Sequence, residues 1–132
     1  MCGISGLIGW YKGVNEGLST IKKMSNSLIH RGPDDNGIWK DHHSEIFLGH
    51  NRLSILDLSQ NGKQPMTSHC ERFTITFNGE IYNHLKIRKL LDNENKMSWC
   101  GSSDTETLIE AIEAFGLKKT LKLCLGMFSF AI

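Results

Sequence analysis

The chain has 132 residues, of which 39% are hydrophobic and 22% are charged, and its formal net charge is +1. These values are typical of a single globular domain, and they exclude a disordered chain or one built from membrane-spanning helices. The balanced charge also excludes the broad positive field that collects nucleic acid or anionic lipid. We therefore predict one domain with no nucleic-acid partner and no membrane partner.

The first half of the chain predicts strand, helix, loop and strand in that order. Residues 2–10 form an apolar run interrupted by glycines, which predicts a buried strand. Apolar side chains recur every three or four positions over residues 17–29 and predict an amphipathic helix. The turn formers of HRGPDDNG predict a sharply bent loop over residues 30–37, with Gly37 free to take positive φ. Residues 45–56 predict one or two further strands.

A long loop, a strand and a helix are predicted next. Residues 57–70 contain glycine, proline and several polar side chains, which are typical of a surface loop. Residues 72–77 alternate polar and apolar side chains, and this pattern predicts a strand that ends at Asn78-Gly79, a dipeptide that favours tight turns. Residues 81–91 carry an apolar stripe at helical spacing and predict a helix.

A capped helix and a final strand complete the predicted elements. Ser103 and Glu106 fit the capping box, in which each side chain accepts a hydrogen bond from a first-turn amide, so we predict a helix over residues 104–115. Residues 126–132 predict a strand. Because no turn or polar tail follows this strand, we expect its sheet to continue beyond the chain.

The cysteines indicate a reducing environment. Cys2, Cys70, Cys100 and Cys124 are far apart and form no C-x-x-C pair, whereas small secreted domains use dense cysteine frameworks. The apolar run near the N-terminus also lacks the preceding basic residues and the cleavage site of a signal peptide. We therefore expect reduced thiols and a cytoplasmic protein.

Cys2 can combine a nucleophile and a base in one residue. Its small side chain allows an aminopeptidase to remove Met1, which leaves the thiol beside a free α-amine. A free α-amine is a mild base near neutral pH and can accept the thiol proton directly or through water. The alternative interpretation is that Cys2 is a small buried hydrophobe at the start of a strand.

Other residues offer oxyanion donors and charges, each with a structural alternative. Asn78 and the backbone N–H of Gly79 can stabilise an oxyanion, although a simple hairpin turn explains the same dipeptide. Arg52 can bind a carboxylate through two parallel hydrogen bonds, or it can lie at a strand edge in solvent. Asp104 can bind an ammonium group, or it can interact only with the helix dipole.

No sequence motif indicates a metal or a nucleotide. The six histidines show no H-x-x-x-H spacing and no cysteine partners at the intervals of zinc sites. Gly62-Lys63 lacks the rest of a phosphate-binding loop. We therefore predict neither a metal site nor an ATP site in this chain.

Five motifs carry a resemblance to a known family. MCGISG, HRGPDDNG, GHNRLSILD, NGEIYNH and SDTE occur in this order, and together they resemble the N-terminal glutaminase domain of asparagine synthetases, a class II glutamine amidotransferase. The resemblance implies an α+β fold of the N-terminal-nucleophile hydrolase type, an αββα sandwich of two antiparallel sheets between helices, over residues 1–132. In the family, further strands follow a segment like GMFSFAI, so we expect the second sheet to be incomplete.

The resemblance also implies a role for each matching residue. Cys2 corresponds to the nucleophile, and Asn78 and Gly79 correspond to the oxyanion-hole pair. The residues implied to bind glutamine are Arg52 for the α-carboxylate, Leu53, Ile55 and Leu56 for its supporting strand, and Glu80 and Asp104 for the α-amino group.

Two hypotheses for function follow. The first is a glutaminase half-reaction that hydrolyses L-glutamine and supplies ammonia for asparagine synthesis from aspartate. This domain then needs no cofactor, whereas ATP and Mg²⁺ serve only a synthetase domain or chain that accepts the ammonia, and the full-length family suggests a homodimer. The second hypothesis is a truncated, non-catalytic fragment or interaction module.

Overall fold

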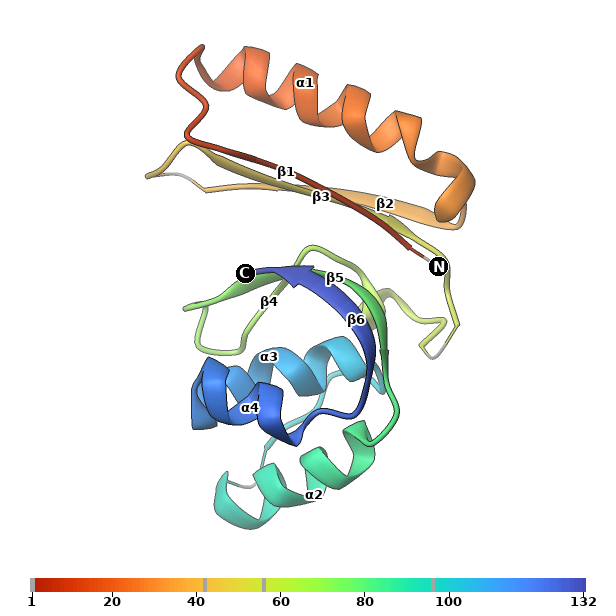
Figure 1. Cartoon of the computed structure of the whole chain (residues 1–132), viewed down its shortest axis with the longest axis vertical. Coiled ribbons are helices and arrows are strands. Elements are labelled where there is room, and N and C mark those ends of the chain that lie inside the picture. Colours follow the sequence, from red (N-terminus) through yellow and green to blue (C-terminus); the bar gives the residue numbers. More distant parts are fainter. Residues whose placement is uncertain (1, 42, 56, 96) are drawn as a thin grey trace.

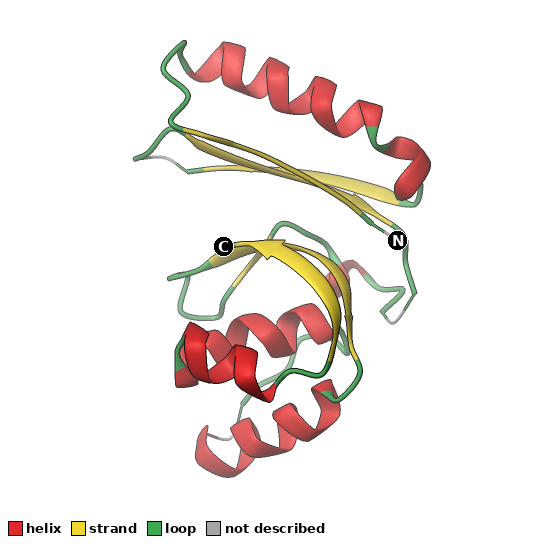
Figure 2. Ribbon diagram, in the orientation of Figure 1, coloured by secondary structure: helices red, strands yellow, loops and turns green. Residues whose placement is uncertain are grey.

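The fold is a sandwich of four layers: one helix, two sheets and a group of helices (Figure 1). The computed structural model describes residues 2–41, 43–55, 57–95 and 97–132. The strands are β1 (Gly3–Ile8), β2 (Asp35–Lys40), β3 (Ile46–Arg52), β4 (Met66–Thr67), β5 (Thr74–Ile81) and β6 (Gly126–Ala131). The helices are α1 (Val14–Ser27), α2 (His84–Asn95), α3 (Asp104–Phe115) and α4 (Leu117–Leu123), with short 3₁₀ turns at Ile29–Arg31 and Gln60–Gly62. Both sheets lie between helices (Figure 2), which confirms the predicted α+β sandwich.

The first sheet has the strand order β1-β3-β2, and α1 covers its outer face (Figure 1). The buried side chains of Ile21 on α1 and Phe47 on β3 lie in this layer. A side chain at Gly17 would collide with the Phe47 ring, so glycine lets the helix approach the sheet closely. The predicted amphipathic helix is confirmed, although it begins at Val14.

Two predictions for this sheet are wrong. β1 is an edge strand and not a buried one, and its Ile8 side chain is 80% exposed. The end of the predicted 30–37 loop belongs to β2, where Asp35 pairs with Arg52 of β3, and Gly37 has no positive φ. Pairing with a distant strand therefore overrides the local turn signal in this segment.

The second sheet has the order β4-β5-β6, and its outer face packs against the other helices. The buried core between them contains Ile75, Phe77, Ile81, Ile87, Leu91, Leu108, Ile109, Ala111 and Ile112. The predicted bounds of α3 and β6 are confirmed to within one residue, α2 begins at His84, and α4 was not predicted. In the described part of the chain, no helix is both long and apolar enough to cross a membrane.

The prediction that a strand ends in a turn at Asn78-Gly79 is also wrong. Both residues lie inside β5, which continues to Ile81. Strand β6 pairs with this part of β5, and Gly79 lies opposite Phe128. A Cβ atom at Gly79 would lie 2.5 Å from the Phe128 Cα atom, and φ at Gly79 is +154°. Glycine is therefore needed for close packing of the two strands and not for a turn.

The predicted surface loop over residues 57–70 is partly buried. It contains the second 3₁₀ turn and β4, and the side chains of Asp57, Gln64 and Ser68 are buried. The Gln64 amide accepts a hydrogen bond from Phe77 N at 2.7 Å and donates one to Thr105 Oγ1 at 3.1 Å. This segment therefore connects β5 to α3.

The predicted capping box of α3 is only half formed. Ser103 Oγ accepts a hydrogen bond from Glu106 N at 3.2 Å, as predicted. The Glu106 carboxylate instead accepts from the amides of Cys100 at 2.7 Å and Gly101 at 3.0 Å. Glu106 therefore holds the segment that precedes the cap.

Candidate active site

A pocket opens where the two sheets meet the start of α3. Its volume is about 150 Å³. Every described residue of the predicted site lines it, namely Cys2, Arg52, Leu53, Ile55, Asn78, Gly79, Glu80 and Asp104. Leu56, the remaining predicted residue, lies outside the described residues. The fold thus brings residues from widely separated parts of the chain to one cavity.

Cys2 precedes the edge strand β1 and is held from two sides. Leu53 N lies 3.4 Å from Cys2 Sγ and donates a hydrogen bond to the sulfur, while Leu53 O lies 3.7 Å from the same sulfur. Arg31 Nε donates to the Cys2 carbonyl oxygen at 3.0 Å. These contacts place the half-buried thiol at the wall of the pocket.

One edge of β5 directs backbone N–H groups away from β6. Phe77 N donates to Gln64 Oε1 at 2.7 Å, and Ile81 N donates to Asp104 Oδ2 at 2.9 Å. Backbone N–H groups alternate in direction along a strand, and the β5–β6 register is regular through this region. The N–H group of Gly79 therefore lies on the same edge. It is placed between Gln64 and Asp104, the acceptors of the two neighbouring N–H groups, which both line the pocket.

Asn78 contributes an amide oxygen that the described part of the chain leaves without a partner. Its Oδ1 atom is buried and has no hydrogen-bond partner among the described residues. Rotation of the amide by half a turn exchanges this oxygen with the NH₂ group, so the position can present an acceptor or a donor. Because a buried unpaired polar group costs free energy, a reacting group that pairs with Asn78 as its charge develops is stabilised.

Arg52 ends β3 and is only 7% exposed. Its Nη1 atom donates to Ser59 O at 2.9 Å, and its Nη2 atom donates to Asp57 O. A guanidinium group has five N–H donors, so these two bonds leave others for a ligand. Arg52 therefore holds Asp57 and Ser59 of the following loop and also presents a positive charge to the pocket.

Leu53 and Ile55 do not lie in the predicted supporting strand. β3 ends at Arg52, and both Leu53 and Ile55 lie in the loop that follows. The Ile55 side chain is 67% exposed. The backbone leaves the sheet here because Arg52 bonds to carbonyl groups farther along the same loop.

Asp57, to which sequence reasoning assigned no role, joins this loop to the start of α3. Its Oδ1 atom accepts bonds from Ser59 N at 2.8 Å and Ser59 Oγ at 2.6 Å, and its Oδ2 atom accepts from Ser102 N at 2.8 Å. The hydrogen bond from the Ser59 side chain, with help from the backbone amides, lowers the pKa of Asp57 to about 2. The ionised carboxylate thus connects two walls of the pocket.

Two carboxylates face the pocket from β5 and α3. Glu80 is exposed, whereas Asp104 is 5% exposed and accepts the hydrogen bond from Ile81 N. Burial raises the pKa of Asp104, and the bond from Ile81 opposes this effect. The pocket therefore contains negative charge from these residues and positive charge from Arg52.

His50 is a buried pocket residue that sequence reasoning missed. Its Nε2 atom lies 3.1 Å from Phe77 O, and it must donate this bond because a carbonyl oxygen only accepts. The Nδ1 atom is then unprotonated, and it has no hydrogen-bond partner among the described residues. Burial is the main reason that the pKa of His50 falls from 6.5 to about 4. A neutral imidazole therefore links the two sheets.

Replacing His50 with glutamine is expected to make folding less sensitive to acid. Between pH 6.5 and about 4, the unfolded chain binds a proton at His50 and the folded chain does not. The free energy of unfolding therefore falls as the pH falls through this range, by up to about 3 kcal/mol. Urea unfolding at several pH values checks this. His84 also has a lowered pKa, but it makes the same contribution in both proteins and does not affect their difference. Parallel curves of unfolding free energy against pH for the wild type and His50→Gln would contradict the prediction.

Comparison with known sequences identifies the family. The profile of the glutamine amidotransferase domain matches residues 1–132. The chain belongs to this family. It is 36% identical over 132 residues to the glutamine-hydrolysing asparagine synthetase of Triphysaria versicolor, covering the whole chain and 21% of that relative. It is also 37% identical over 113 residues to asparagine synthetase 3 of Bacillus subtilis, covering 84% of the chain and 18% of that relative.

This amidotransferase domain is also 32% identical over 132 residues to asparagine synthetase 1 of Arabidopsis thaliana, covering the whole chain and 21% of that relative. The domain thus spans roughly a fifth of the length of these curated relatives. Three residues that hold its pocket, Arg31, His50 and Asp57, lie within the motifs that carry the family resemblance. Their place in those motifs was the signal available in the sequence.

Proposed function

We propose that this domain hydrolyses L-glutamine to glutamate and ammonia. The observation that supports the proposal is that Cys2 lines the same pocket as Arg52 and the carboxylates of Glu80 and Asp104. Glutamine carries an anionic carboxylate and a cationic amino group, which these opposite charges can bind. Its side-chain amide is then left to react with the thiol.

The chain's own residues supply each step of this reaction. After removal of Met1, the α-amine of Cys2 takes the thiol proton, and Sγ attacks the amide carbon of glutamine. The Gly79 N–H group and the Asn78 amide donate hydrogen bonds to the oxyanion. The carbon–nitrogen bond then breaks, and ammonia leaves with a proton from the α-ammonium group. Water hydrolyses the thioester, which releases glutamate and restores the thiol.

The ammonia is proposed to serve asparagine synthesis from aspartate. This step rests on the names of the longer relatives, which are glutamine-hydrolysing asparagine synthetases. We assign ATP and Mg²⁺ to a synthetase region outside residues 1–132 and assign no cofactor to the glutaminase step.

Intact-mass measurement with a glutamine-mimicking diazoketone tests the proposal. We expect a chain that lacks Met1 and gains one adduct, and we expect Cys2→Ala to gain none. Cys100→Ser is the matched control because Cys100 is an exposed thiol that does not line the pocket, and it is expected to retain the adduct. An unmodified chain, or an adduct that persists in Cys2→Ala, would overturn the assignment. The unmodified chain would favour a non-catalytic binding module.

A further inference from the structure

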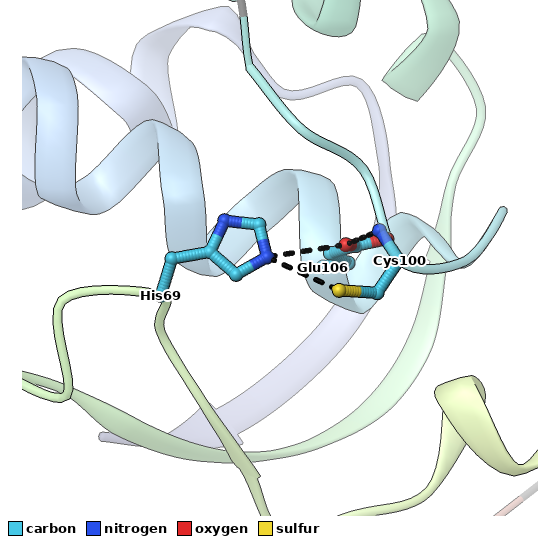
Figure 3. Close-up of side chains that lie close together, drawn as sticks. All are labelled: His69, Cys100 and Glu106. Carbon is cyan, nitrogen blue, oxygen red and sulfur yellow. Dashed lines mark hydrogen bonds and ion pairs between the residues drawn. The ribbon is translucent and has the colours of Figure 1, made fainter.

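Three side chains from separate segments converge outside the pocket. His69 lies in the loop between β4 and β5, Cys100 lies just before α3, and Glu106 lies in the first turn of α3 (Figure 3). His69 Nε2 is 3.4 Å from Cys100 Sγ and 3.8 Å from Glu106 Oε1, and the three ligand atoms all lie within 4.8 Å of one another. We propose that these residues bind one Zn²⁺ ion.

The distances fit zinc coordination with little movement. Typical Zn–S and Zn–N bonds at the tetrahedral angle place sulfur and nitrogen about 3.6 Å apart, and nitrogen and a carboxylate oxygen about 3.4 Å apart. The observed 3.4 Å and 3.8 Å lie close to these separations. Because His69 and Cys100 are exposed, the ion has a route of entry and water can take the fourth position.

Glu110 gives an independent reason to expect a metal at His69. This carboxylate is only 3% exposed, and its Oε1 atom accepts a hydrogen bond from His69 N at 2.9 Å. Its Oε2 atom lies 3.7 Å from His69 Nδ1. In many zinc sites a carboxylate holds the proton on one ring nitrogen and leaves the other nitrogen for the metal. The 3.7 Å contact is longer than a hydrogen bond, and a small rotation of the ring would complete it. Here the other nitrogen, Nε2, faces Cys100 and Glu106 (Figure 3).

Glu106 is also oriented before any ion binds. Its Oε2 atom accepts from Arg88 Nη2 at 3.1 Å and from Gly101 N at 3.0 Å. Its Oε1 atom accepts from Cys100 N at 2.7 Å and is the oxygen nearest His69. Arg88 therefore pairs with one carboxylate oxygen, while the other remains next to the proposed ligands.

A bound ion would join the β4–β5 loop to the segment that leads into α3. Sequence spacing predicted no metal site because His69 and Cys100 are 31 residues apart, and only the fold brings them together. The Cys100 thiol loses its proton to the solvent when it binds the ion. Because Zn²⁺ binds the folded chain, it is expected to raise the melting temperature.

Titration of the reduced, metal-free chain with Co²⁺ and then Zn²⁺ tests the site. We expect one Co²⁺ per chain, with tetrahedral absorption bands and a sulfur-to-cobalt charge-transfer band that Zn²⁺ abolishes. Cys100→Ser is expected to remove that band and to weaken Zn²⁺ binding more than about 100-fold. Glu110→Gln is expected to weaken it about 10- to 100-fold, as for other residues that orient a ligand.

Two other thiols provide the controls. Cys70 is adjacent to His69 in the chain, but its sulfur faces Ser68 Oγ at 3.4 Å, so Cys70→Ser is expected to bind Zn²⁺ as the wild type does. Cys2→Ala is expected to bind it unchanged, although this variant lacks the proposed nucleophile. The absence of a charge-transfer band in the wild type, or its loss in Cys70→Ser or Cys2→Ala, would overturn the site. These outcomes do not depend on glutamine hydrolysis.

Discussion

Replacing Asn78 with alanine is expected to lower kcat for glutamine hydrolysis by about two to three powers of ten while KM changes little. The Asn78 side chain lines the pocket with Cys2, and its Oδ1 atom is buried without a partner among the described residues. Half a turn of the amide places its NH₂ group at this position, where it can donate a hydrogen bond to the oxyanion. That bond strengthens only as charge develops, and its loss therefore reduces kcat more than substrate binding. Steady-state measurement of glutamate release checks both parameters.

Folding measurements separate this effect from a loss of structure. Because the Asn78 Oδ1 atom is buried without a partner, truncation to alanine removes no hydrogen bond of that atom and is not expected to lower the melting temperature. Asn26→Ala, on the exposed face of α1, is the matched control and is expected to retain full activity. An Asn78→Ala variant with most of its activity would remove Asn78 from the oxyanion hole.

Arg52→Lys is expected to raise KM for glutamine about 10- to 100-fold, with a smaller effect on kcat. Lysine keeps the positive charge but loses the planar arrangement of donors. The buried guanidinium already bonds to the carbonyl groups of Asp57 and Ser59, and its other donors are proposed to bind the α-carboxylate. Steady-state kinetics check this change, with Arg72→Lys as the control because Arg72 is exposed.

A substrate analogue distinguishes carboxylate binding from general loop distortion. Glutamine in which hydrogen replaces the α-carboxylate keeps the amino group and the side-chain amide. If Arg52 binds the carboxylate, Arg52→Lys weakens binding of glutamine but leaves binding of the analogue nearly unchanged. Equal losses for both compounds would indicate that Arg52 acts only by holding the loop at Asp57 and Ser59.

Several elements were predictable because their signals are local. The apolar spacing of α1 indicated its buried face, and Ser103 caps α3 at the expected residue. Periodicity and capping depend on side chains within about one or two helical turns of each other. The family resemblance that the five motifs carry, which is not a local signal, implied a common site for Cys2, Arg52 and Asn78. The pocket contains all three residues, although their proposed roles remain predictions.

Tertiary contacts decided the features that local patterns misjudged or missed. Asn78-Gly79 continues β5 because β6 pairs with it from a position about fifty residues farther along the chain. His50 becomes a buried neutral link only when the two sheets pack face to face. The convergence of His69 with Cys100 similarly depends on packing of the β4–β5 loop against α3. Local patterns carry no information about such partners, because strand pairing and side-chain convergence join residues that are near in space and distant in sequence.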